Sequence, residues 1–199
     1  MMPILWLASY PRSGNTWLRV FLSNLWAEDD AGAADINQLN VSSHAADRYT
    51  FDEALAIESS DMSPDEVDRL RPHVYRAMAA QASAPLIVKV HDAYGFTSGG
   101  EPLFPADVSV GAIYVVRNPL DVAVSLVHFW NRPADEVIDA MARGDHALAG
   151  RGLSRQLAQR LLSWSRHVFR LWIASNRRSA VTGARGERAG HSVFDGSAR

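Results

Sequence analysis

The sequence contains no cysteine, and this absence excludes disulfide bonds and thiolate metal sites. A chain without disulfides suits a reducing compartment, so we expect it to reside in the cytoplasm. Long hydrophobic runs are also lacking, because no segment reaches the roughly 20 apolar residues of a membrane span. The apolar run near the N-terminus is too short for a signal peptide and has no basic segment before it. We therefore expect no association with a membrane.

The chain also lacks a large excess of either positive or negative charge. The chain carries 21% charged residues and a formal net charge of -2, and its pI is near 6.4. Nucleic acids and acidic membranes attract proteins with a broad excess of Lys and Arg, so neither is an expected partner. The seven histidines show no metal-ligand spacing, and the H-E-x-x-H pattern is absent. The sequence predicts no metal site.

The hydrophobic pattern predicts an α/β fold. Three short runs rich in β-branched or aromatic residues read as buried parallel strands, at residues 4–9, 85–91 and 111–116. Helices are predicted over residues 16–26, 63–82, 119–130 and 153–174. Residues 29–61 are interpreted as a loop with short helical pieces that lines a substrate site. This order indicates three layers, with a central parallel sheet flanked by helices and a site at the carboxyl ends of the strands.

The most informative motif is the octapeptide from Tyr10 to Trp17, Tyr-Pro-Arg-Ser-Gly-Asn-Thr-Trp. It follows a predicted strand and opens a predicted helix, so backbone N–H groups and the helix dipole point at one spot. Such a loop cradles a phosphate or sulfate. It differs from the nucleoside-triphosphate loop, because G-x-x-x-x-G-K-[ST] is absent and the cation, Arg12, precedes Gly14. The loop alone is also compatible with an ordinary turn.

Two further groups of residues lie at predicted strand ends. Arg117 ends the third strand, where its planar guanidinium suits a terminal phosphate, and Ser125 lies on the helix that follows. Lys89 and His91 share one face of the second strand by the two-residue period, which places a cation beside a titratable base. The structural alternatives are an ion pair between Arg117 and Asp121 and a hydrogen-bonded structural role for His91.

Together, these three motifs resemble the sulfotransferases that use 3′-phosphoadenosine 5′-phosphosulfate (PAPS), over roughly residues 3–170. The resemblance implies a P-loop-NTPase-like sulfotransferase fold. In that family the first motif is typically Tyr-Pro-Lys-Ser-Gly-Thr-Thr-Trp. By this resemblance, the 5′-phosphosulfate is bound by Arg12, Ser13, Gly14, Asn15 and Thr16. Trp17 packs on adenine, unless it is a core residue like Trp6 and Trp26, and Arg117 with Ser125 binds the 3′-phosphate.

The resemblance also implies a reaction. His91 is expected to act as general base, Lys89 and Arg12 to stabilise charge, and the acceptor to be a small molecule with a hydroxyl or amine. PAP, the desulfated nucleotide, is the implied product, and no metal is implied. An aromatic cluster, His128, Phe129 and Trp130, either borders the acceptor or belongs to the core.

The resemblance fails toward the C-terminus. The sequence predicts a sulfotransferase-like domain over residues 1–176 and a disordered tail over residues 177–199, which contain few large apolar residues. A further strand and a glycine-rich loop expected of the family are absent, so we expect a truncated or frameshifted end, an exposed sheet edge and a tendency to form a homo-oligomer. One alternative is therefore a homologue that binds PAP or PAPS but is catalytically defective. A P-loop-type nucleotide kinase is a lower alternative.

Overall fold

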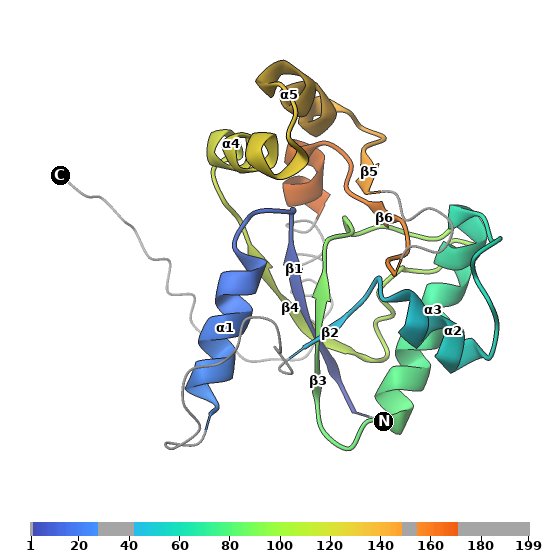
Figure 1. The fold of residues 1–199 in the computed structure, drawn as a ribbon. Coiled ribbons are helices and arrows are strands. Elements are labelled where there is room, and N and C mark those ends of the chain that lie inside the picture. The colour runs from blue at the N-terminus through green and yellow to red at the C-terminus, as the bar shows by residue number, and fades with distance from the viewer. Residues whose placement is uncertain (1, 28–41, 149–154, 171–199) are drawn as a thin grey trace, which may run out of the picture.

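The computed structural model describes residues 2–27, 42–148 and 155–170. Within them, four strands form one sheet in the order β2-β3-β1-β4, and all neighbouring pairs are parallel. The strands are β1 (Ile4–Ser9), β2 (Ser43–His44), β3 (Leu86–Val90) and β4 (Ser109–Val115). This parallel sheet with helices around it confirms the predicted α/β class (Figure 1).

Helices surround the sheet, with α1 and α3 on opposite sides of the strands in Figure 1 and α4 and α5 beyond the ends of β1 and β4. Their bounds are α1 (Asn15–Leu25), α2 (Arg48–Leu55), α3 (Pro64–Gln81), α4 (Pro119–Trp130) and α5 (Ala134–Ala142). Helix α3 begins at a capping box, because the hydroxyl of Ser63 accepts from the N–H of Glu66 while the Glu66 carboxylate accepts from the N–H of Ser63. The helices predicted over residues 16–26, 63–82 and 119–130 agree with α1, α3 and α4 to within one residue at each end.

The main core lies between the sheet and α3. On β1, the alternate residues Ile4, Trp6 and Ala8 are buried in one cluster that also contains Tyr75 and Ala79 of α3. The indole of Trp6 meets the ring of Tyr75 edge-on, with centroids 4.9 Å apart. Because this packing fixes α3 against the sheet, side chains from α3 can reach the loop after β3.

The helix predicted over residues 153–174 is wrong in its first part. The chain instead forms β6 (Gln159–Arg160), antiparallel to β5 (Ala147–Leu148), and residues 164–170 are helical. Leu157 and Leu161 are both buried and lie four residues apart, which imitates a helical face. Their N–H groups bind the carbonyls of Ala46 and His146, so long-range backbone hydrogen bonds override the local pattern.

The remaining differences are smaller. Helix α5 was not predicted, while β2 and α2 both fall in the segment predicted as loop with short helical pieces. The part of that segment at residues 29–41, the domain boundary at residue 176 and the predicted tail lie outside the described residues.

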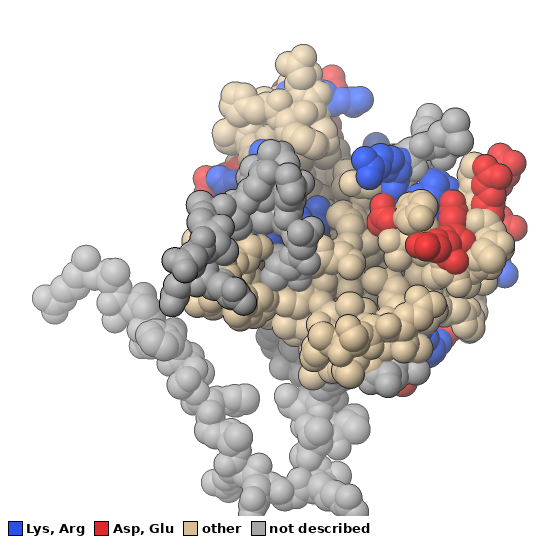
Figure 2. All heavy atoms as spheres, turned by 60° about the horizontal axis from the view of Figure 1, so that its bottom comes forward, with Lys and Arg blue, Asp and Glu red and all other residues tan. Residues whose placement is uncertain are grey.

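Charged side chains do not form one broad surface of a single sign on the face that Figure 2 shows. Most of that face is uncharged, and groups of both signs gather together on one side. In the described part of the chain, no helix is long and apolar enough to cross a membrane. The same residues contain no group of three or more His, Asp or Glu side chains arranged to hold a metal ion.

Candidate active site

The turn between β1 and α1 depends on two residues with left-handed backbones, Arg12 (φ 66°) and Gly14 (φ 107°). Gly14 occupies the N-cap position of α1, and no side chain caps this helix start. The first N–H groups of α1 and the positive end of its dipole thus favour an anion. The hydroxyl of Ser13 is buried without a hydrogen-bond partner. A buried orphan hydroxyl beside an uncapped helix start fits a phosphate or sulfate oxygen.

Asn15 has a structural role that its place in the motif did not reveal. Its buried side-chain Nδ2 donates to the carbonyl of Leu7 at 2.9 Å and to the hydroxyl of Ser9 at 3.3 Å. These contacts fasten the first turn of α1 to the end of β1. Because the side-chain amide already donates to these two groups, only the backbone N–H of Asn15 is available to bind an anion.

The structure brings the first motif and the Arg117 motif together. The Nε of Arg12 donates to Oγ of Ser125 at 3.0 Å, and Nη1 of Arg117 donates to the carbonyl of Arg12 at 3.2 Å. Arg12 also lies over the ring of Phe129, 4.8 Å from its centroid. The alternative pairing of Arg117 with Asp121 is present only as an exposed contact at 4.0 Å, which contributes little. Two exposed guanidinium groups and a hydroxyl therefore meet at one edge of the sheet.

His91 lies directly after β3, and its ring is oriented by β1. Its Nδ1 is 2.8 Å from the carbonyl oxygen of Ser9. Since a carbonyl can only accept, Nδ1 carries the proton and Nε2 keeps a free lone pair. Burial, followed by the charge of Lys89, lowers the pKa of His91 to about 4. The imidazole is therefore a neutral base throughout the physiological range.

Lys89 lies on the same strand face as His91. Burial, followed by the positive charge of Arg19, lowers the pKa of Lys89 to about 8. On the neighbouring strand, His44 pairs in register with Lys89, and its ring meets that of His91 edge-on with centroids 6.3 Å apart. Neither His44 nor Arg19 was predicted as a site residue. His44 lies on β2, a strand of two residues without a pattern of its own, and Arg19 lies on α1 beyond the motif that ends at Trp17.

A second pair of side chains holds the backbone of His91. Nε2 of the fully buried His167 donates to the carbonyl of His91 at 2.9 Å, and Nδ1 of His167 accepts from the hydroxyl of Tyr114 at 2.8 Å. The rings of Tyr10 and His167 pack in a T-shaped arrangement, with centroids 5.3 Å apart. These contacts join segments more than 50 residues apart, so no local sequence signal pointed to them.

The aromatic residues around the loop differ from one another in burial. Trp17 is 70% exposed and stacks on Phe21, with centroids 5.8 Å apart and planes 10° apart, so the alternative that Trp17 is a core residue is wrong. Trp26 is also exposed, whereas Trp6 is buried. In the cluster on α4, Phe129 is exposed, and Trp130 packs against a second group of buried residues that includes Tyr10 and Leu126.

The family model described as the sulfotransferase domain matches residues 3–173 of the chain. No curated protein matches the sequence of the chain.

Proposed function

The chain belongs to the sulfotransferase domain family, and we propose that it transfers a sulfuryl group from PAPS to a hydroxyl or amine of a small-molecule acceptor. One observation carries this proposal. Ser9, the last residue of β1, binds the ring of His91 through its carbonyl and the start of α1 through the side chain of Asn15. A neutral base with a free Nε2 is thus fixed next to an anion-binding turn, as proton removal from an acceptor beside a bound sulfate requires.

We propose that the turn and α4 bind the two ends of the donor. Arg12, the Ser13 hydroxyl and the backbone N–H groups of Gly14, Asn15 and Thr16 would hold the 5′-phosphosulfate. Arg117 and Ser125 would hold the 3′-phosphate, since Arg117 is exposed and its contact with Asp121 is weak enough to be replaced. The exposed ring of Trp17 would offer a flat surface to adenine.

The donor supplies the sulfuryl group and leaves as PAP, with additional negative charge on its 5′-phosphate. His91 Nε2 takes the proton of the acceptor hydroxyl while the acceptor oxygen bonds to sulfur and the bond from sulfur to the phosphate oxygen breaks. Lys89 and Arg12 stabilise the charge that develops on the transferred and leaving groups. Arg12 remains charged at any relevant pH, so it stabilises the leaving oxygen without protonating it. We place the reaction in the cytoplasm, in keeping with a chain without cysteine.

The proposal is tested by His91→Gln, with the exposed His73→Gln of α3 as the matched control. Transfer from PAPS to a screen of phenols and alcohols should fall by about 10²- to 10⁴-fold in His91→Gln, the usual contribution of a positioned base. Calorimetric titration with PAP should give the same affinity for wild type and both variants, with little affinity for ADP or ATP–magnesium.

Two other results would contradict the proposal in different ways. Binding of PAP without transfer to any acceptor would leave a nucleotide-binding protein without catalysis. Preference for ATP–magnesium would instead indicate a nucleotide kinase.

A further inference from the structure

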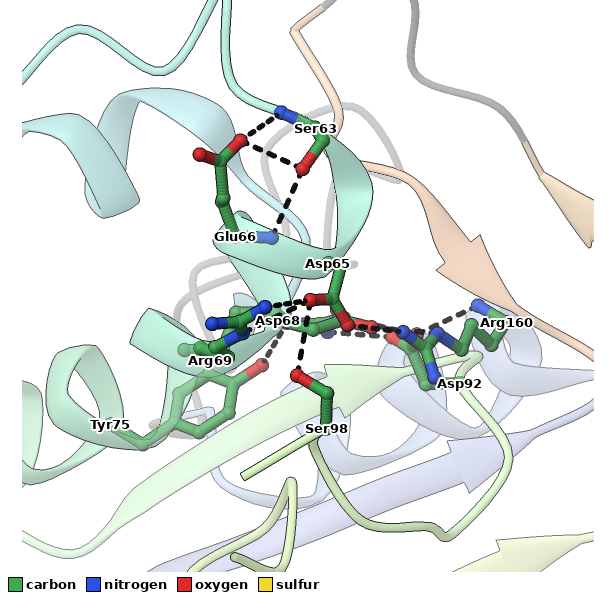
Figure 3. Close-up of polar contacts among 10 residues, drawn as sticks. Ser63, Asp65, Glu66, Asp68, Arg69, Tyr75, Asp92, Ser98 and Arg160 are labelled. Atoms are coloured by element: carbon green, nitrogen blue, oxygen red, sulfur yellow. Dashed lines mark hydrogen bonds and ion pairs between the residues drawn. The ribbon is translucent and has the colours of Figure 1, made fainter. Parts of the chain in front are cut away.

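Figure 3 shows the polar contacts of Asp92, which belongs to a cluster of opposite charges. The guanidinium of Arg71, from the middle of α3, is completely buried and binds both carboxylate oxygens of Asp92, at 3.0 and 2.6 Å. Asp92 is the residue directly after His91. The bidentate geometry fixes the orientation of the Asp92 carboxylate as well as its position.

Neighbouring groups complete this cluster. Nε of Arg71 donates to the hydroxyl of Tyr75 at 2.9 Å, and its Nη1 also contacts Asp68 at 3.3 Å. The backbone N–H of Arg160 donates to Asp92 at 2.9 Å, while the Arg160 side chain binds Asp68 at 2.7 Å. Figure 3 shows Asp68, Asp92 and Arg160 turned toward one another between α3 and β6. Asp92 is therefore held by a helix on one side and by β6 on the other.

The position of this cluster links it to the base. His91 and Asp92 are consecutive, and their side chains reach different partners: His91 contacts Ser9 of β1, whereas Asp92 contacts Arg71 of α3. A shift of Asp92 would move the peptide that it shares with His91. The contact of 2.8 Å between His91 Nδ1 and Ser9 would then lengthen, and the ring would lose its fixed tautomer and direction.

We propose that Arg71 and Asp92 are positioning residues for His91, anchoring the backbone so that Nε2 is held toward the acceptor. This inference rests on the proposed function, because it gives the anchor a role in the reaction. Neither residue is expected to touch a substrate. Small displacements of a reacting group cost about 10²-fold in rate, so loss of the anchor should lower kcat by about that factor.

The test has to separate positioning from folding, because removing one partner of a buried ion pair destabilises the protein strongly. The double variant Arg71→Met/Asp92→Leu removes both charges, while Asp68 and Arg160 keep each other as partners. Replacement of a buried pair by apolar groups is often neutral for stability. Arg76→Met/Asp107→Leu is the matched control, since it removes another bidentate Arg–Asp pair, between Arg76 of α3 and Asp107, that is exposed to solvent.

The rate is measured with PAPS and 2-naphthol as the probe acceptor. We expect a kcat about 10²-fold below wild type in the buried double variant, with the melting temperature and PAP affinity retained. The control should retain kcat. Arg71→Lys should fall between wild type and the double variant, because lysine keeps the charge but loses the fork. A folded double variant with kcat within about threefold of wild type would overturn the proposal.

A second readout does not depend on activity. In protein with ¹⁵N-labelled histidine, the ring of His91 should show a single tautomer protonated at Nδ1 in the wild type and in the control. The buried double variant, and Asp92→Asn where it folds, should show both tautomers. If the wild type transferred no sulfuryl group, the proposed function would fail, and a change of tautomer would still support the anchor. An unchanged His91 tautomer in the double variant would overturn it.

Discussion

The two sides of the candidate active site are built differently. On the side of α3, Arg71 and Asp92 are fully buried, and their charged groups are bound by other groups of the protein. On the side of α4, Arg12 and Arg117 are exposed and are joined by single hydrogen bonds. The base is therefore preorganised by the fold, whereas the cations are free to exchange water for a ligand.

The difference follows from the cost of burying charge. An ion in the protein interior loses its hydration and must recover the energy from paired charges and hydrogen bonds, which requires a fixed geometry. An exposed guanidinium keeps its water, so its protein contacts contribute little to folding and leave it available to an anionic ligand. Substitutions on the two sides should consequently separate stability from ligand affinity.

The largest expected effect is on stability, from Arg71→Met alone. This change leaves Asp92 as a buried carboxylate without its guanidinium partner, so the free energy of unfolding should fall by about 3–5 kcal/mol. Arg117→Met should change it by less than about 0.5 kcal/mol, because Arg117 is exposed. Urea unfolding at neutral pH measures both. Equal losses in the two variants would remove the distinction between the sides.

The sequence predicted the features that depend on neighbouring residues. The strand before the loop, the capping box at Ser63 and the N-terminal Pro119 of α4 are local signals, and the structure has each where predicted. The ion pair of Arg71 with Asp92 spans 21 residues, and the hydrogen bond from His167 to the carbonyl of His91 spans 76, so tertiary packing alone creates them. Long-range hydrogen bonds also replaced the first part of the helix predicted over residues 153–174.

The second effect is on ligand affinity, from Arg117→Ala. Charge-assisted hydrogen bonds contribute about 1.5–3 kcal/mol, so the affinity for PAP should fall by roughly 10- to 150-fold with little loss of stability. Calorimetric titration measures this loss. Arg132→Ala is the control, because Arg132 is an exposed arginine that pairs with Glu136 at 3.5 Å. An unchanged affinity in Arg117→Ala would exclude this side as the 3′-phosphate site.

The pH dependence of the rate tests the preorganised side, which holds the partly buried base His91. Because the pKa of His91 is lowered to about 4, kcat/KM should stay level as the pH falls from 7 to 5, where an ordinary histidine would already lose its basic form. Above pH 8 the rate should fall, because the pKa of Lys89 is lowered to about 8 and its charge is lost there. A decline centred near pH 6.5 would mean that His91 is solvated.

The free energy of unfolding should also depend on pH through His91. The unfolded chain binds a proton at His91 below about pH 6.5, whereas the folded chain binds it only near pH 4. The unfolded state therefore holds more protons in this window, and the free energy of unfolding should decrease as the pH falls through it. His91→Gln should reduce this decrease, while Arg117→Ala should leave it unchanged, as urea unfolding at pH 7 and pH 5 would show.

The smallest expected effect comes from Tyr114 of β4, and it tests whether this strand contributes to the positioning of His91. Tyr114→Phe removes the hydroxyl that donates to His167, which leaves Nδ1 of His167 without that donor and should cost about 1 kcal/mol of stability. The hydrogen bond from His167 to the carbonyl of His91 remains, so kcat with PAPS and 2-naphthol should change by less than about fivefold. His167→Phe removes both contacts and should lower kcat further than Tyr114→Phe. If Tyr114→Phe instead reduced kcat by about 10²-fold at unchanged stability, the hydroxyl would act in the reaction itself, and the preorganised side would reach across the sheet to β4.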